Sequence, residues 1–142
     1  MAVAHGDQLH DTLSALALFA DLSTAELEAI AHTMEERYFA EGERILRQGL
    51  SGSGFYIILD GEAAARVNGV DVNRLGRGDF FGEISVLLGE APSADVTALR
   101  PLRCAILAAP QVEAFIVAHP RVAFRMLQAE ARKLRNATRW RS

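Results

Sequence analysis

The sequence has little cysteine and no long hydrophobic run. Cys104 is its one thiol, which excludes an internal disulfide framework and a multi-cysteine metal site. No apolar run approaches the roughly 20 residues that span a bilayer. The first residues, from Met1 to Asp7, carry neither a basic n-region nor the apolar core of a signal peptide. These absences predict a cytoplasmic protein with no membrane partner.

Acidic residues are scarce at the C-terminus. Residues 121–142 contain seven basic side chains and a single acid, Glu130, so their net charge is +6, whereas the first 120 residues sum to −9. A basic segment suits nucleic acid or an acidic partner. Cations near the end of a solvated helix are also explained by the helix dipole alone. Since no recognition helix follows, we expect no direct DNA binding.

Helical periodicity marks the beginning of the chain. Asp11 is expected to cap a short helix that runs to about Phe19. Ser23 and Glu26 have the spacing of a capping box, and an amphipathic apolar pattern follows them. The sequence therefore predicts a second helix that begins at Ser23 and ends near Glu36.

Short runs separated by glycine replace the helical pattern in the middle of the chain. Asp60-Gly61 and Asn68-Gly69 have the composition of two-residue hairpin turns, in which both turn positions need positive φ. The segment from Val70 to Asn73 alternates as a half-buried strand does. Many short strands at this spacing predict a mainly β fold, either a sandwich or a barrel.

The helical period returns after Ala109. Pro110 suits the first helical position, and His119-Pro120 breaks the helix because the residue before proline avoids the α region. Two C-terminal helices are expected, the second over residues 120–139. An apolar seam on this second helix predicts a homodimer contact; the seam residues are Ala123, Leu127, Ala131 and Leu134.

Histidine is too sparse to support a metal-dependent enzyme on such a β fold. The four histidines all lie outside residues 37–107, where the strands are expected, so a cupin-type metal site has no ligands there. No nucleophile, base and orienting group can be recognised together. The sequence therefore predicts no catalytic residues, no metal and no cofactor, and a chain that is not an enzyme; a bound transition metal would contradict this.

Three landmarks in a fixed order resemble the cyclic nucleotide-binding domain family. Leu16 to Ser23 is similar to the family's entry helix, and Gly49 to Gly61 is similar to its second glycine landmark and turn. Gly78 to Leu88 resembles the phosphate-binding cassette. The likeness is to the effector domain of catabolite activator proteins, without the DNA-binding domain. It implies an eight-stranded jelly-roll β-barrel with flanking helices. As boundaries we expect a single domain over residues 1–142, with helices at 11–36, the barrel at 37–108 and the C-terminal helices at 110–139.

The resemblance also implies a ligand, cAMP or cGMP, and residues that hold it. The cyclic phosphate would lie against the short helix that starts near Gly82, and Glu83 would accept a hydrogen bond from the ribose 2′-hydroxyl. Ser93 and the Ala94 amide match positions that contact the phosphate. The implied ligand-binding set is Gly82, Glu83, Ile84, Ser85, Ser93 and Ala94, and a lid over the base would come from Leu127, Leu134 and Trp140.

One position departs from the family pattern. Aligned without gaps, the cassette arginine falls on Pro92, which offers neither charge nor N–H. That arginine makes a bidentate, charge-assisted contact with the phosphate. Losing such a bond costs about 1.5–3 kcal/mol, or roughly 10- to 100-fold in affinity. We therefore expect weak or absent binding of cyclic nucleotide.

Two functions follow from these observations. The first is a non-catalytic sensor or regulatory module, in which ligand shifts the population of C-terminal helix positions about the His119-Pro120 bend and an effector protein responds. The alternative is a degenerate domain that binds no cyclic nucleotide and acts as a protein-interaction or dimerisation module through residues 120–139.

Overall fold

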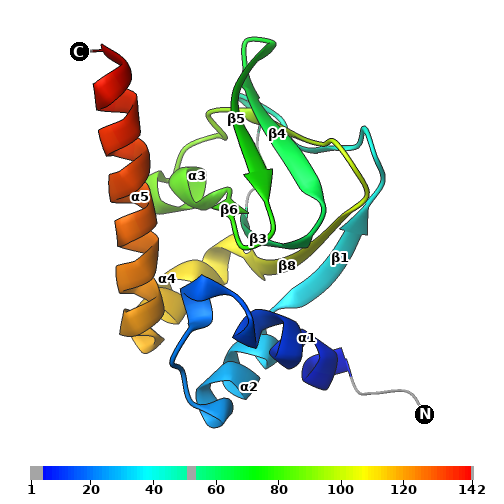
Figure 1. Cartoon of the computed structure of the whole chain (residues 1–142), viewed down its shortest axis with the longest axis vertical. Helices are drawn as coiled ribbons and strands as arrows, with labels where there is room; N and C mark the ends of the chain where they lie inside the picture. Colours follow the sequence, from blue (N-terminus) through cyan, green and yellow to red (C-terminus); the bar gives the residue numbers. More distant parts are fainter. Residues whose placement is uncertain (1–4, 51–53, 142) are drawn as a thin grey trace. The chain divides into compact units, whose positions relative to one another are not determined.

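Eight antiparallel strands form two four-stranded sheets. The computed structural model describes residues 5–50 and 54–141, with side chains over 9–50 and 54–138. One sheet has the order β1-β8-β3-β6 and the other β2-β7-β4-β5 (Figure 1). The strands are β1 (Glu35–Phe39), β2 (Arg44–Leu46), β3 (Gly54–Asp60), β4 (Glu62–Val67), β5 (Val70–Gly76), β6 (Phe80–Phe81), β7 (Asp95–Ala98) and β8 (Leu102–Ala108). The predicted jelly roll is confirmed, although the described strands form two facing sheets and not one closed barrel.

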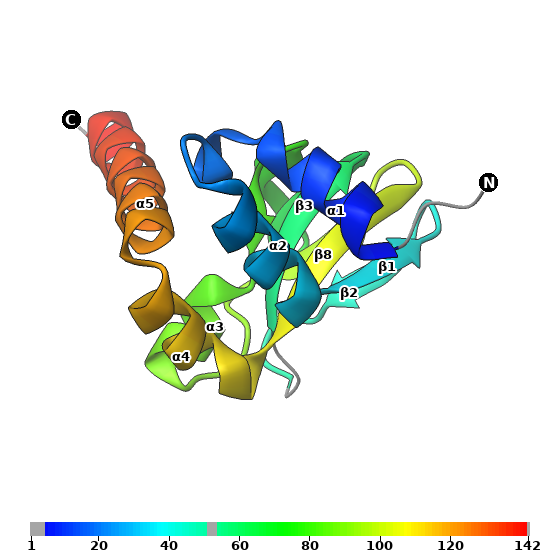
Figure 2. The same cartoon turned by 90° about the horizontal axis from the view of Figure 1, so that it is seen from below.

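The apolar core lies between the two sheets. It takes one face of each strand, with Ile58 of β3, Phe81 of β6, Val96 of β7 and Cys104 of β8 among its members. On β3 and β8 the opposite face is buried as well, as Ile57 shows. Figure 2 shows helix α2 (Thr24–Thr33) on that outer side, next to β3 and β8. Burial of both faces explains why these two strands are continuous apolar runs in the sequence.

The N-terminal helices differ from the prediction in their bounds. Helix α1 runs over His5–Ser14, so Asp11 lies inside it and does not cap it. The segment leading to Phe19 is a separate 3-10 turn, η1 (Ala17–Phe19). Ser23 does cap α2, because its hydroxyl accepts a hydrogen bond of 3.1 Å from the Glu26 amide. Helix α2 nevertheless ends at Thr33 and not near Glu36, because β1 begins at Glu35 and pairs with β8.

Only one of the two predicted hairpins is a hairpin. β4 and β5 pair directly, and the connecting residues Asn68 and Gly69 have φ of 52° and 79°, as predicted. Asp60-Gly61 joins β3 to β4, and these strands belong to different sheets. It is therefore a corner between the sheets, and its close packing on the Pro101 carbonyl explains the glycine.

β5 is an edge strand and is more exposed than its sequence suggested. It pairs only with β4 among the described strands. Val70 and Val72 are both largely exposed, and Leu75 is the β5 side chain that enters the core. The prediction of a half-buried strand, made from the alternation between Val70 and Asn73, was therefore wrong.

A second compact unit, Glu113–Ser142, follows the first, Met1–Val112. Helix α4 (Ala109–Ala118) ends one residue before His119, and α5 (Pro120–Arg141) begins at the proline, so the predicted break is confirmed. The backbone remains hydrogen bonded through the break. The His119 amide donates to the Phe115 carbonyl, and the Ala123 amide donates to the His119 carbonyl, both over 3.0 Å.

Candidate functional site

The cassette glycine is held in a conformation and a space that only glycine fits. Gly82 precedes helix α3 (Glu83–Leu88) and has a left-handed backbone with φ of 86°. A Cβ placed on it would overlap the Gly54 carbonyl oxygen at the start of β3 and would lie 3.2 Å from the Tyr56 ring. β3 therefore fixes the position at which α3 begins.

Glu83 is the acid that the structure buries at this point. It is the first residue of α3 and is only 3% exposed. Burial of a carboxylate is costly unless polar groups face it. A ribose hydroxyl would be a suitable donor, and the role of Glu83 as its acceptor stays a prediction.

The other two predicted residues on α3 differ in their surroundings. Ile84 is exposed, whereas Ser85 is buried. The Ser85 hydroxyl donates to the Gly82 carbonyl over 3.3 Å, so it closes the first turn of its own helix. Any contact of these two residues with a ligand remains a prediction.

The segment that follows the cassette is tied to the loop after β2. Pro92 is buried, and its carbonyl accepts a hydrogen bond of 2.9 Å from the Gly49 amide. Asp95 accepts a second bond, of 2.7 Å, from the Gln48 amide. The Asp95 carboxylate is thus engaged with the backbone. Between them Ser93 is exposed and Ala94 half-buried.

Gln48 extends this network to the β4–β5 hairpin, which the sequence did not predict. Its side chain accepts from the Asn68 amide over 2.9 Å and donates to the Asn68 side-chain oxygen over 3.2 Å. Three loops that are far apart in the sequence are therefore joined beside residues 92–95. A glutamine ahead of a glycine carries no local signal for a contact with a distant hairpin, so sequence reasoning had no means to find it.

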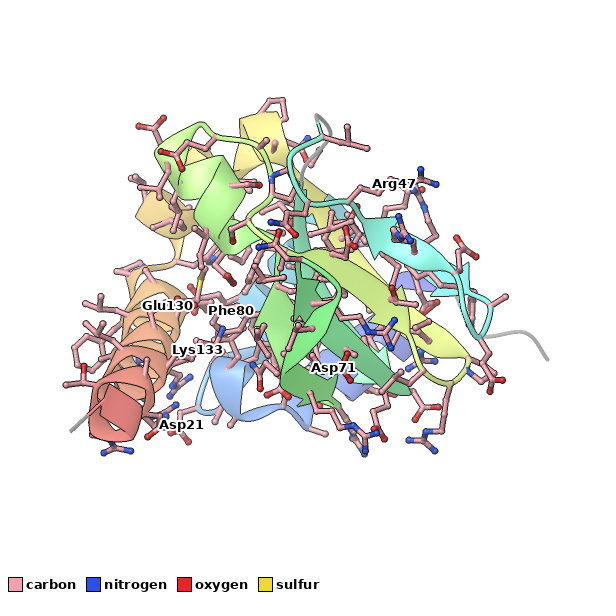
Figure 3. The ribbon with its side chains drawn as sticks, turned by 90° about the horizontal axis from the view of Figure 1, so that it is seen from above. Asp21, Arg47, Asp71, Phe80, Glu130 and Lys133 are labelled. Carbon is pink, nitrogen blue, oxygen red and sulfur yellow. The ribbon has the colours of Figure 1, made fainter. Side chains whose placement is uncertain are left out.

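The arginine nearest in register to this segment is already paired. Arg66 on β4 lies opposite Asp95 on β7. Its Nε donates to the carboxylate of Asp71, which Figure 3 labels on the β4–β5 hairpin. Arg66 therefore does not supply an unpaired cation in place of the missing cassette arginine.

A pocket of about 400 Å³ opens beside Tyr56. The Tyr56 ring stacks on Phe81 with centroids 4.8 Å apart, and burial raises the pKa of its phenol. Across the pocket Arg37 bonds to Glu35 over 3.0 Å, and this bond raises the pKa of the guanidinium. Tyr56 also borders Gly82, but the residues that line the pocket include none of the cassette from Gly78 to Leu88.

The predicted base lid lies on α5. Leu127 and Leu134 are exposed, and the side chain of Trp140 falls outside the described part of the chain. Residues 51–53 of the second glycine landmark are also outside it. The lid stays a prediction.

Within the described ranges, 5–50 and 54–141, no group of three or more His, Cys, Asp or Glu side chains is arranged to hold a metal ion. In the same ranges no helix has the length and apolar character needed to cross a membrane.

Comparison with known proteins identifies the family that this fold and cassette define. The family model described as "Cyclic nucleotide-binding domain" matches residues 36–119, which include all eight strands except the first residue of β1. This chain belongs to the cyclic nucleotide-binding domain family.

Similar proteins include a kinase regulatory subunit, a protein kinase and a catabolite activator protein. The chain is 43% identical over 100 residues to a cAMP-dependent protein kinase regulatory subunit of Mucor circinelloides f. lusitanicus, covering 67% of this chain and 23% of that protein. It is 37% identical over 91 residues to a cGMP-dependent protein kinase of Eimeria tenella, covering 64% and 9%. The catabolite activator protein of Thermus thermophilus has a similar structure, with a TM-score of 0.75, 28% identity and coverage of 85% and 59%. The chain thus spans less than a quarter of the length of either kinase protein.

Proposed function

We propose that the chain is a non-catalytic regulatory domain whose cassette binds a cyclic nucleotide weakly. The observation that carries this proposal is the cassette itself, in which Gly82 and the buried Glu83 stand at the start of α3 within a family-matched jelly roll. Kinase relatives named for cAMP and cGMP support these two nucleotides as ligands. Phosphate affinity is reduced because Pro92 brings no cation to the segment after the cassette.

The regulatory step belongs to the second unit. Ligand at the cassette would favour one arrangement of the helices about His119-Pro120, and an effector protein would bind that arrangement. Leu127, Leu134 and Trp140 would cover the base. We further propose that residues 1–142 act as one domain and that the protein works in the cytoplasm.

Calorimetric titration of the whole chain with cAMP and with cGMP tests the proposal. We expect saturable heat from at least one of them, with a dissociation constant well above the submicromolar range. A submicromolar constant would show that another group supplies the missing charge. Absence of heat at millimolar ligand would reject cyclic nucleotide binding.

A second function is favoured by the way in which residues 92–95 are fixed. Pro92 and Asp95 are both held by the loop at Gln48 and Gly49, and neither residue brings a positive charge to the segment after the cassette. A domain kept for its surface and not for its pocket fits this arrangement. It would bind protein partners in the presence and in the absence of nucleotide, which a pull-down with and without cAMP distinguishes.

A further inference from the structure

The pocket beside Tyr56 is a second concave site, separate from the cassette. Its volume of about 400 Å³ lies in the range of small-molecule sites, and its lining comes from α2, β1, β3, β8 and α4. Glu35 pairs with Ile106, and Ile106 pairs with Tyr56, so these three side chains form one row on one face of the sheet. Gln111 of α4 also lines the pocket. Residues far apart in the sequence are thus brought together around one hollow, which the cassette does not use.

The charged side chains in the lining are one acid and one base. They are Glu35 and Arg37, whose oxygen and nitrogen stand 3.0 Å apart, and both side chains are more than half exposed. An ion pair this exposed contributes little to stability, so it can open to a ligand at little cost. The lining therefore places an acceptor for a cation beside a donor for an anion, and the two formal charges cancel.

The rest of the lining combines a phenol with apolar surface. Burial raises the pKa of the Tyr56 phenol, and the charge of Arg37 acts on it in the opposite direction with a smaller effect. The hydroxyl therefore stays protonated at neutral pH and can donate a hydrogen bond on the side of the guanidinium. A ligand with an apolar part would find apolar side chains here as well, from Met34, Ile106 and Ala108.

We propose that this pocket binds a free α-amino acid with an apolar side chain, whose ammonium bonds to Glu35 and whose carboxylate bonds to Arg37 and the Tyr56 hydroxyl. An α-amino acid carries both charges on one carbon atom, which suits an acceptor and a donor that stand 3.0 Å apart. A carboxylate without an ammonium would meet repulsion from Glu35, and an amine without a carboxylate would meet repulsion from Arg37. The apolar side chain of the ligand would lie against Ile106 and its neighbours in the lining.

Two analogues of L-phenylalanine test whether both charges are needed. 3-Phenylpropionate lacks the ammonium and phenethylamine lacks the carboxylate, whereas the ring and its two-carbon chain are kept. In amide NMR titrations of the full chain, L-phenylalanine should bind saturably and each analogue about tenfold more weakly, because one charge-assisted bond is lost. The largest shifts should fall at Glu35, Arg37 and Tyr56. Equal affinities for the three compounds overturn the proposal, as do largest shifts within Gly82–Leu88 or no saturable shift with millimolar L-phenylalanine.

Neutralising one charge at a time gives a result that a loss of structure would not produce. Glu35→Gln should weaken L-phenylalanine about tenfold but strengthen 3-phenylpropionate, whose carboxylate then meets Arg37 without its acid. Arg37→Gln should weaken L-phenylalanine to a similar extent but strengthen phenethylamine. Arg44→Gln is the matched control, since it removes an exposed arginine of β2 outside the lining, and it should leave all three affinities unchanged. Parallel weakening of all three compounds by either pocket variant, or equal weakening of L-phenylalanine by Arg37→Gln and Arg44→Gln, rejects the proposal.

Discussion

At the scale of single residues, Pro92 decides how well the cassette holds an anion. Helix N-terminal amides offer about half an elementary charge, whereas the ring phosphate carries a full one and must leave water. The Pro92 carbonyl, which bonds to Gly49, belongs to the backbone, so this bond does not depend on the proline ring. Pro92 is buried, however, so a charged side chain in its place needs both room and a polar partner, which the phosphate would supply.

Replacing Pro92 by Arg should strengthen cAMP binding by about 1.5–3 kcal/mol, or roughly 10- to 100-fold, because it restores a charge-assisted contact with the phosphate. Calorimetric titration of the native and Pro92→Arg chains measures the difference. Ala91→Arg is the matched control, since it adds the same charge at a neighbouring, exposed position that is not in the predicted ligand-binding set. Equal gains in the two variants would show a general charge effect and would contradict a specific contact at position 92.

Cys104 shows what burial alone does to one side chain. The thiol is fully buried in the core between the sheets, and this burial raises its pKa from 9.0 to about 12. In the unfolded chain the thiol ionises near its ordinary pKa. The protonated thiol therefore favours the folded state below pH 9, and this contribution is lost as the pH rises toward 12.

Cys104→Ala should remove this pH dependence. Between about pH 8 and about pH 11 the native chain should lose up to about 3 kcal/mol more free energy of unfolding than the variant, since about two pKa units at 1.36 kcal/mol each are involved. Urea unfolding of both proteins at the two pH values measures the loss. A constant difference between native and variant across this range would show that the thiol is not held protonated by the fold.

At the scale of elements, β3 and α3 are coupled through one glycine. Gly82 and Gly89 flank the same short helix, and both have left-handed backbones, with φ of 86° and 67°. They differ in their surroundings, because a Cβ at Gly82 would meet the Gly54 carbonyl, whereas one at Gly89 would meet nothing within 4 Å. This difference separates backbone strain from steric overlap.

Gly82→Ala should destabilise the fold by about 2 kcal/mol more than Gly89→Ala, because both add left-handed strain but only the first adds an overlap with β3. Chemical denaturation of the two variants and the native chain gives the values. In addition, Gly82→Ala should move the start of α3 and weaken nucleotide binding. Equal destabilisation by the two substitutions would mean that β3 yields easily and does not fix the cassette.

The sequence predicted correctly those helix caps, turns and breaks that depend only on neighbouring residues. Ser23 before Glu26, Asn68-Gly69 and His119-Pro120 each act through neighbouring backbone, and the structure has the cap, the hairpin and the break. Asp60-Gly61 looks like a hairpin for the same local reason. Which sheet each following strand joins depends on distant partners, however, and these are not encoded in two residues.

For the candidate site, the sequence indicated the start of α3 but not the contacts around residues 92–95. The cassette pattern singled out Gly82 and Glu83; the structure packs the first closely and buries the second, and their role in binding stays a prediction. The contacts of Gln48 with Asp95 and with Asn68 join residues that are 47 and 20 positions apart, respectively. No periodicity or turn signal reports on pairs at that separation.

At the scale of the whole molecule, the chain carries a binding cassette in one compact unit and an amphipathic helix in the other. The cassette, which includes β6 and α3, lies in Met1–Val112, whereas α5 carries exposed apolar side chains such as Leu127 and Leu134. Helix α4 passes from the first unit into the second and ends just before the His119-Pro120 break. Under the proposed function, α4 would therefore couple occupancy of the cassette to the position of α5.

Ligand binding to the folded chain should raise the free energy of unfolding of the whole molecule. At a concentration one hundred times the dissociation constant, cAMP or cGMP should add about 2.7 kcal/mol, because it binds the folded state and not the unfolded one. At roughly 3 °C per kcal/mol for a chain of this size, the melting temperature should rise by roughly 8 °C. Thermal unfolding followed by circular dichroism over a ligand series measures the shift.

5′-AMP is the control. It has the same base and ribose as cAMP but an open, more highly charged phosphate, so it should give a much smaller shift. The Pro92→Arg chain should reach the same shift at lower concentrations of the cyclic nucleotide. If the melting temperature of neither protein rises with cAMP or cGMP at millimolar concentration, the cassette does not bind them and the domain acts through its surface. Equal rises with 5′-AMP and cAMP would show that the cassette does not recognise the cyclic phosphate.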